Sequence, residues 1–169
     1  MYYLAKGFHP DNDGFDEIIL NNKIVKGEWK QGFVFKTNEH TYIGYAEQYD
    51  DDLFYSPKNI FSEVIPETVC VWTGLYDNTK WEELSDSERF SSENYNKEKD
   101  WKGRKIFEND IVSVSYLECG ELCAEDATVT YTNGSWAPFN WAYSCDGCDC
   151  TLSIKSVKIV GNVFKERKI

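Results

Sequence analysis

Two cysteine-bearing segments contain the residue types whose spacing could build a metal site. Cys119 and Cys123 are separated by three residues, and Cys145 and Cys148 form a Cys-x-x-Cys pair with Gly147 in its turn. Four thiolates that converge on one Zn²⁺ would form a tetrahedral site. Such a site would be structural, because four protein ligands leave no position for water or a substrate.

The same cysteines have two other interpretations. The first pair is spaced more widely than a Cys-x-x-Cys pair, and Cys150 is surplus to a four-ligand site. Cysteines of a cytoplasmic protein stay reduced. We therefore favour unligated thiols over structural zinc, with a disulfide between the two segments as the third alternative, and we expect no other cofactor.

A zinc site would require three strands to bring the two cysteine segments together. Alternating apolar residues predict strands at Ile111–Leu117, Ala127–Thr132 and Ser135–Tyr143. Asn133-Gly134 is a strong signal for a tight hairpin between the last two of these strands. If the three strands form an up-down-up meander, both cysteine segments emerge at the same end of the sheet.

Motifs for other chemistry are incomplete or absent. The segment from His9 to Gly14 has two acids and a glycine but lacks the remaining ligands of a calcium loop. The run Asp50–Asp52 is interpreted as a solvated acidic corner, because three consecutive residues on a turn do not converge on one ion. The sequence contains no nucleophile elbow, phosphate loop or dinucleotide fingerprint. We therefore expect a protein that is not an enzyme.

The charge of the chain limits the classes of partner. There are 29 acidic and 18 basic residues, and the net charge is −11. Neutralising phosphates requires clustered basic residues, so this charge argues against an ordinary nucleic-acid binder. The alternative is a nucleic-acid-related role, either as an acidic DNA mimic or by direct binding through Lys102, Arg104 and Lys105.

Composition predicts a mainly β fold. Aromatic residues make up 16% of the chain, and they favour pleated surfaces. The aromatic residues near the second cysteine segment could form a stacking platform for bases, but without basic neighbours we interpret them as core; they are Trp136, Phe139, Trp141 and Tyr143.

The segment Lys102–Tyr116 predicts a β-hairpin at the centre of a small barrel or sandwich. It contains a short strand at Lys105–Phe107 and a second strand at Ile111–Tyr116. Asn109 stands in the break between them, where we expect a positive φ that Asn tolerates.

A helical insertion interrupts the β pattern. Residues 78–100 are polar, and both Thr79 with Glu82 and Ser85 with Glu88 have the spacing of a helix capping box. We expect one to three helical turns there.

The sequence gives no sign of a membrane or export segment. Its N-terminus lacks the apolar core of a secretory signal, and no run approaches the roughly 20 apolar residues of a membrane helix. We expect a cytoplasmic protein without membrane association.

Five short segments together resemble the YopX family of phage- and prophage-encoded proteins. In order along the chain they are Gly27–Trp29 with Gly32, Val64–Val69, Trp72–Asp77, Gly103–Val112 and Val160–Phe164. The chain departs from the family pattern at Asn109, where the family usually has glycine, and in the long insertion at residues 78–100.

The resemblance implies an N-terminal β lobe, residues 1–66, followed by an SH3-like barrel domain, residues 67–169, which carries the insertion. It implies no enzymatic activity and no catalytic residues. We expect a protein-binding accessory module that binds a host or phage protein through the acidic and aromatic surface of the barrel domain or through the insertion at residues 78–100. Self-association is a further expectation, because exposed strand edges can pair.

Overall fold

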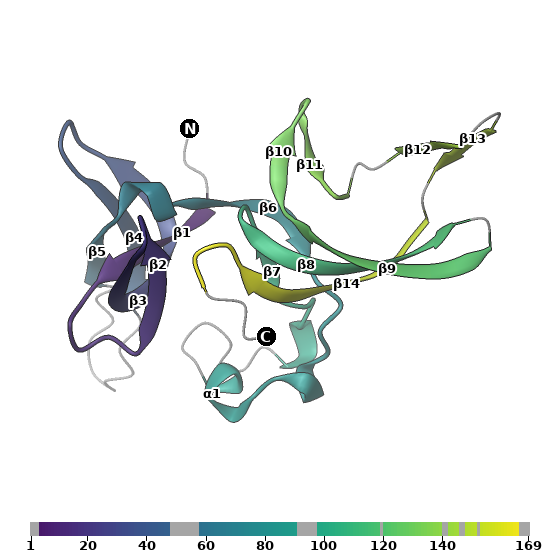
Figure 1. The fold of residues 1–169 in the computed structure, drawn as a ribbon. Coiled ribbons are helices and arrows are strands. Elements are labelled where there is room, and N and C mark those ends of the chain that lie inside the picture. The colour runs from purple at the N-terminus through teal and green to yellow at the C-terminus, as the bar shows by residue number, and fades with distance from the viewer. Residues whose placement is uncertain are drawn as a thin grey trace. The chain divides into compact units, whose positions relative to one another are not determined.

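The structure is a computed structural model, and it describes residues 4–47, 58–90, 98–118, 120–139, 142–145, 148–151 and 153–165. Antiparallel strands dominate these residues, which confirms the predicted mainly β fold (Figure 1). The described residues include no helix that is long and apolar enough to cross a membrane.

The chain forms two compact units. Unit 1 comprises Met1–Trp72 and Phe164–Ile169, and unit 2 comprises Thr73–Val163. The predicted domains, residues 1–66 and 67–169, stay a prediction, because compactness alone does not show which segments fold independently.

Unit 1 is built on an antiparallel sheet with the strand order β5-β4-β3-β1-β6, and β2 pairs with β3 on the side. The strand β6 continues into unit 2, where it neighbours β7. The elements of this unit are β1 (Leu4–Pro10), β2 (Asp16–Leu20), β3 (Lys23–Lys36), β4 (Thr41–Glu47), β5 (Lys58–Val64), the 3-10 turn η1 (Pro66–Thr68) and the first half of β6 (Cys70–Tyr76).

One buried cluster of unit 1 lies on one face of this sheet. Ala5, Ile43 and Val64 are buried together, and Val34 and Val69 pack against them. These side chains come from alternate positions of their strands, so the neighbouring positions project from the opposite face of the sheet.

The unit 2 strands form a three-stranded antiparallel sheet, in the order β14-β8-β9, and two separate hairpins, β10-β11 and β12-β13. No closed barrel is found among the described strands. The strands are β7 (Lys105–Phe107), β8 (Asp110–Glu118), β9 (Glu121–Thr128), β10 (Thr130–Thr132), β11 (Ser135–Ala137), β12 (Ala142–Cys145), β13 (Cys148–Thr151) and β14 (Ser153–Asn162).

The core of unit 2 lies on one face of the three-stranded sheet. Its aromatic neighbours Trp136 and Phe139 pack against this core, in agreement with their interpretation as core residues. Trp141 lies outside the described residues. The buried cluster contains Ile106, Val112, Val114, Tyr116, Val129 and Val157.

The predicted Asn-containing turns are confirmed. Asn133 and Gly134 both have positive φ and join β10 to β11, as the hairpin signal predicted. Asn109 has a φ of 66°, again as predicted.

The predicted hairpin across Asn109 is wrong. The strand β7 neighbours β6, whereas β8 lies between β14 and β9 in a different sheet. The side chain of Asp110 is buried at this point, where its Oδ2 accepts the Phe107 N–H at 2.8 Å and its Oδ1 accepts Asn162 Nδ2 at 3.0 Å. The Asp110 carboxylate thus links the start of β8 to β7 and to Asn162 at the end of β14.

The predicted helical insertion is confirmed between β6 and β7. It contains the 3-10 turn η2 (Trp81–Glu83), the α-helix α1 (Asp86–Arg89) and the 3-10 turn η3 (Glu98–Asp100). Ser85 and Glu88 form the predicted capping box of α1.

The other predicted capping box, Thr79 with Glu82, is wrong. The Lys80 N–H donates to Glu83 Oε2 at 3.0 Å, one residue later in the chain. The Thr79 hydroxyl instead donates to Asp77 Oδ2 at 2.7 Å, which removes it from the helix terminus.

Candidate functional site

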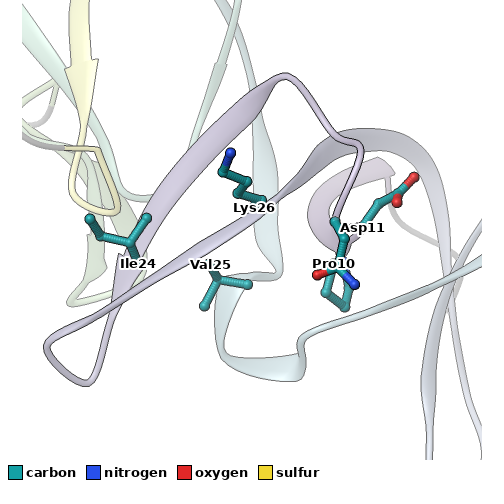
Figure 2. A pocket seen from close by; sticks show the side chains of 6 residues that line it. Pro10, Asp11, Ile24, Val25 and Lys26 are labelled. Atoms are coloured by element: carbon teal, nitrogen blue, oxygen red, sulfur yellow. The ribbon is translucent and has the colours of Figure 1, made fainter.

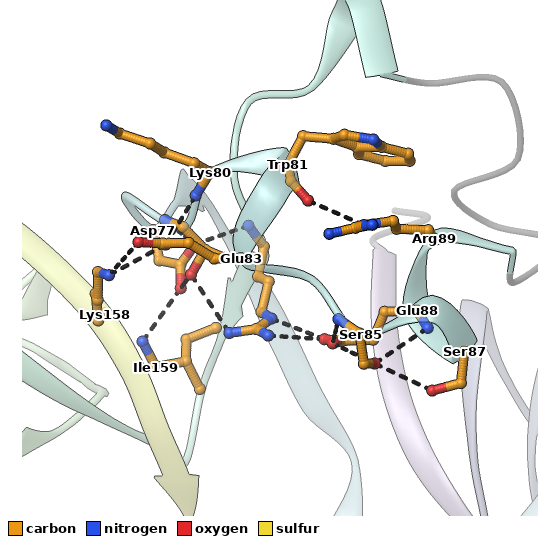
Figure 3. Close-up of polar contacts among 12 residues, drawn as sticks. Asp77, Lys80, Trp81, Glu83, Ser85, Ser87, Glu88, Arg89, Lys158 and Ile159 are labelled. Carbon is orange, nitrogen blue, oxygen red and sulfur yellow. Dashed lines mark hydrogen bonds and ion pairs between the residues drawn. The ribbon is translucent and has the colours of Figure 1, made fainter.

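A buried carboxylate in unit 2 is the first group with the chemistry of an active site. Asp77 is 2% exposed, and both its oxygens accept hydrogen bonds (Figure 3). Oδ1 accepts the N–H groups of Thr79 at 3.0 Å and Arg104 at 2.8 Å, and Oδ2 accepts the Thr79 hydroxyl and the Ile159 N–H at 3.2 Å. Because four donors from three segments surround this carboxylate, we assign it a structural role.

The same segment covers the outer edge of β14. The Asn78 N–H donates to the Val157 carbonyl at 2.7 Å, and Asn78 Oδ1 accepts the Val157 N–H at 2.7 Å. Lys158 Nζ forms an ion pair with Glu83 at 2.9 Å. An uncovered edge strand can pair with other chains, and these contacts replace such pairing along β14.

Arg104 connects this network to helix α1. Its Nη2 lies 2.8 Å from Glu88 Oε1, and its Nη1 donates to the Thr79 hydroxyl at 3.3 Å. Partial burial raises the pKa of Glu88. The hydrogen bonds from Ser85 and Arg104 lower this pKa by more than burial raises it, so the net shift is downward. The guanidinium is thus occupied within unit 2, which argues against a nucleic-acid contact through Arg104.

A shallow hollow in unit 1 is a second candidate. It has a volume of about 530 Å³ and lies between the start of β3 and the end of β1 (Figure 2). Its charged groups are Asp11, which also accepts the Asp13 N–H at 3.1 Å, and Lys26, which lies 3.8 Å from Glu17. The lining contains no nucleophile paired with a base; it consists of Pro10, Asp11, Asn12, Ile24, Val25 and Lys26.

The predicted zinc ligands lie mostly beyond what the structure describes. Cys119 is outside the described residues. The backbones of Cys145 and Cys148 lie opposite each other in the β12-β13 hairpin, and their side chains are not among those that the structure describes. Cys123 lies on β9 opposite Tyr116, not in a loop, and packs against the core of unit 2.

Metal binding therefore stays a prediction for these four cysteines. In the part of the chain that is described, no group of three or more His, Cys, Asp or Glu side chains could hold a metal ion. The acidic corner Asp50–Asp52 also lies outside that part.

The outward face of β3, β4 and β5 carries a cluster of exposed aromatic residues. Phe33, Phe35 and Phe61 are 55%, 51% and 61% exposed. The registers place Phe33 opposite Gly44 and Gly44 opposite Phe61, while Phe35 lies opposite Tyr42. We call Phe33, Phe35, Tyr42, Gly44 and Phe61 the aromatic face.

Gly44 determines how these rings gather. A Cβ at Gly44 would lie 2.9 Å from Phe61 Cε1, so the ring of Phe61 lies over the space that the absent side chain leaves. The centroids of Phe35 and Phe61 are 6.3 Å apart, and their planes are inclined by 58°. Two strands that flank β4 thus bring their aromatic rings together across it.

A polar rim borders the aromatic face. His40 Nδ1 lies 2.6 Å from Glu63 Oε1, and its Nε2 lies 3.7 Å from Glu39 Oε2. Glu63 lies opposite Tyr42 and two residues after Phe61, so it projects from the same face. The side chains of Glu39 and Glu63 are 85% and 54% exposed. Apolar rings with a charged border have the composition of a binding surface.

The aromatic face was not identified from the sequence. The pattern Phe33-Val34-Phe35 predicts a strand, but alternation alone does not say which side faces the core. One sequence pattern does indicate the exposed side of β5: Phe61 and Glu63 alternate with Ser62 and the buried Val64. A strand with its aromatic residue on the same side as a charged residue suggests that this side faces solvent.

Comparison with models of known protein families, with curated proteins and with solved structures found no match to this chain.

Replacement of Gly103 tests the structural role of the Asp77 segment. Gly103 has a φ of 109°, and a Cβ there would lie 1.9 Å from the Asp77 carbonyl oxygen. We expect Gly103→Ala to lower the free energy of unfolding by more than about 3 kcal/mol, measured by urea denaturation.

Gly134→Ala is the matched control for the backbone conformation. Gly134 also has a positive φ, 84°, but a Cβ there would have no atom within 4 Å. Gly134→Ala should therefore lower the free energy of unfolding only by the conformational cost of about 1–2 kcal/mol. Equal destabilisation by the two substitutions would contradict the close packing of Gly103 against Asp77.

The lowered pKa of Glu88 predicts a pH-dependent contribution to stability. A carboxyl whose pKa is lower in the folded state stabilises the fold above its unfolded pKa and loses this effect as the pH falls through the folded pKa. Urea midpoints of the native chain and of Glu88→Gln should differ at neutral pH and converge in acid, below the ordinary value of 4.5.

The size of this effect should stay below about 1 kcal/mol, because the Glu88 side chain is 39% exposed and solvent screens its ion pair. Glu82→Gln removes a neighbouring exposed carboxylate and serves as the control. A difference between the native chain and Glu88→Gln that is independent of pH would refute the assignment.

Elemental analysis distinguishes the interpretations of the cysteines. We expect protein purified without chelators to contain no stoichiometric zinc and, after denaturation, to release six thiols that react with a thiol reagent. One zinc per chain, lost when Cys145 and Cys148 are both replaced by Ser, would overturn unligated thiols in favour of the structural site.

Proposed function

We propose that this chain is a non-enzymatic protein-binding module that binds a host or phage protein through its aromatic face. The observation that supports the proposal is the exposure of three phenylalanines on one face of β3, β4 and β5. Each is more than half exposed, although burial of one such side chain would contribute about 1.5–3 kcal/mol.

Clusters of exposed aromatic residues are uncommon on proteins that act alone. Contiguous apolar patches with a polar border mark interaction sites, and aromatic residues are enriched in protein interfaces. Here the strands hold the rings on a sheet, so their positions are set before a partner arrives. Little conformational entropy would be lost on binding, which favours affinity.

A phage or prophage origin and a cytoplasmic location are parts of the same proposal. They rest on the resemblance of five segments to the YopX family, as does an SH3-like arrangement of residues 67–169. Two acidic residues of those segments, Asp77 and Asp110, have hydrogen-bonding roles inside unit 2. These two acids are thus accounted for by folding, and we assign binding to surface residues outside the five segments.

A nucleic-acid-related role is the alternative. Exposed rings can stack bases, as in single-strand binding proteins. However, the aromatic face is bordered by Glu39 and Glu63, which repel phosphates. A DNA mimic would instead require acids gathered on one face, whereas Glu125 and Asp126 are consecutive on β9 and project from opposite faces.

Affinity capture with variants of the aromatic face tests the proposal. The tagged chain is incubated with nuclease-treated bacterial lysate, and the retained protein is identified and titrated. We expect Phe33→Ser and Phe61→Ser each to weaken this partner's binding by roughly 30-fold, which is the effect of losing an interface anchor worth about 2 kcal/mol.

Phe90→Ser is the matched control, because Phe90 lies in unit 2 and is 73% exposed. It should bind the partner as the native chain does, and all variants should keep the native urea midpoint. Retention of the partner by Phe33→Ser and Phe61→Ser would contradict the proposal, and capture that depends on intact nucleic acid would favour the alternative.

A further inference from the structure

A carboxylate oxygen at the border of the aromatic face, Glu63 Oε2, is available to a partner. One oxygen of Glu63, Oε1, interacts with His40, while Oε2 has no hydrogen-bond or ion-pair partner among the described residues. Glu39 adds a second exposed carboxylate on the other side of His40. A partner that covered the rings with apolar groups alone would leave these charges less solvated, at a cost in free energy.

The rings themselves attract positive charge. The face of an aromatic ring carries negative electrostatic potential, and a Lys or Arg group within about 6 Å of its centroid is stabilised. This sheet already contains such a contact, because Lys6 Nζ lies 5.4 Å from the ring centroid of Trp29. The inclined rings of Phe35 and Phe61 present comparable faces without a cation among the described residues.

The charge of the whole chain separates the possible occupants. Because the net charge is −11, two copies of the chain repel each other, and the chain also repels a nucleic acid. A basic protein, in contrast, is attracted before contact, which raises its association rate.

We infer that the aromatic face recognises an arginine side chain of a basic partner, which packs against Phe35 and Phe61 and pairs with the Glu63 carboxylate. This inference rests on the proposed function and specifies the chemistry of the partner. Arginine is favoured over lysine because its planar guanidinium stacks on rings and can bind a carboxylate with two N–H groups.

Two blocked peptides test the inference directly. They have the sequence acetyl-Gly-Leu-X-Leu-Gly-amide, where X is arginine in one peptide and the uncharged isostere citrulline in the other. Each is titrated into the full-length ¹⁵N-labelled chain at low salt, and amide shifts are followed. We expect shifts at Phe33, Gly44 and Phe61, with affinity for the arginine peptide roughly three- to tenfold higher.

Glu63→Gln should remove this preference for arginine, because the charge is lost while the amide oxygen can still accept a hydrogen bond from His40. Glu67→Gln, which replaces an exposed carboxylate in η1, should preserve the preference. Equal affinity for the two peptides, shifts confined to other residues, or no shifts at millimolar peptide would each overturn the inference.

Two further probes test the other occupants. An eight-residue oligothymidine that shifts the same amides more strongly than the arginine peptide would overturn the inference in favour of nucleic acid. Shifts at the aromatic face on concentrating the chain alone would overturn it in favour of a second copy. If the peptides fail but Phe61→Ser still loses its captured partner, the proposed function stands and only the arginine anchor is wrong.

Discussion

The alternation of side chains along β3, β4 and β5 is the constraint on which the rest of unit 1 depends. Val34, Ile43 and Val64 must face the core, because their burial stabilises the sheet. The positions between them then face solvent, and there the chain places Phe33 and Phe61 beside Glu63. Folding accounts for the first set of side chains and gives no reason for the second, which is why we connect the second set with binding.

Unit 2 depends on a different kind of interaction, the hydrogen bonding of buried carboxylates. Asp77 joins Thr79, Arg104 and β14, and Asp110 joins β7 to Asn162. Burial of a carboxylate is costly unless its oxygens are paired. Among the described residues, no buried side-chain nitrogen or oxygen lacks a partner. These acids therefore connect segments that are far apart in the sequence. The buried carboxylates of unit 2 thus serve to hold its segments together.

Local features of this fold could be predicted from the sequence, and tertiary pairing could not. The positive φ of Asn109 and of Asn133-Gly134 follows from the backbone preferences of Asn and Gly. The capping of α1 by Ser85 likewise depends on four neighbouring residues. In contrast, the pairing of β7 with β6, and not with β8, depends on the assembled sheets, as does the contact of Asp110 with Asn162, which is 52 residues away. Thr79 matched a capping pattern, but a tertiary contact with Asp77 prevailed.

The candidate surface was less predictable than the fold, because exposure is a property of the assembled sheet. The sequence showed where Phe33, Phe35 and Phe61 occur, but not that three strands bring them to one face or that Gly44 leaves room for their rings. The cysteines were more conspicuous in the sequence, yet Cys123 belongs to a strand and contacts the core. The chemistry of a cysteine can be recognised from its residue type, whereas the exposure of a phenylalanine depends on the assembled sheet.

Site-specific photocrosslinking identifies the molecule that contacts the aromatic face. A benzoylphenylalanine placed at position 61 reports whichever molecule lies against the aromatic face in the cell, and the same residue at position 90 reports background encounters in unit 2. We expect one dominant protein adduct from position 61 that is absent from position 90. Identical adducts from both positions, or none from position 61, would contradict a binding role for this face.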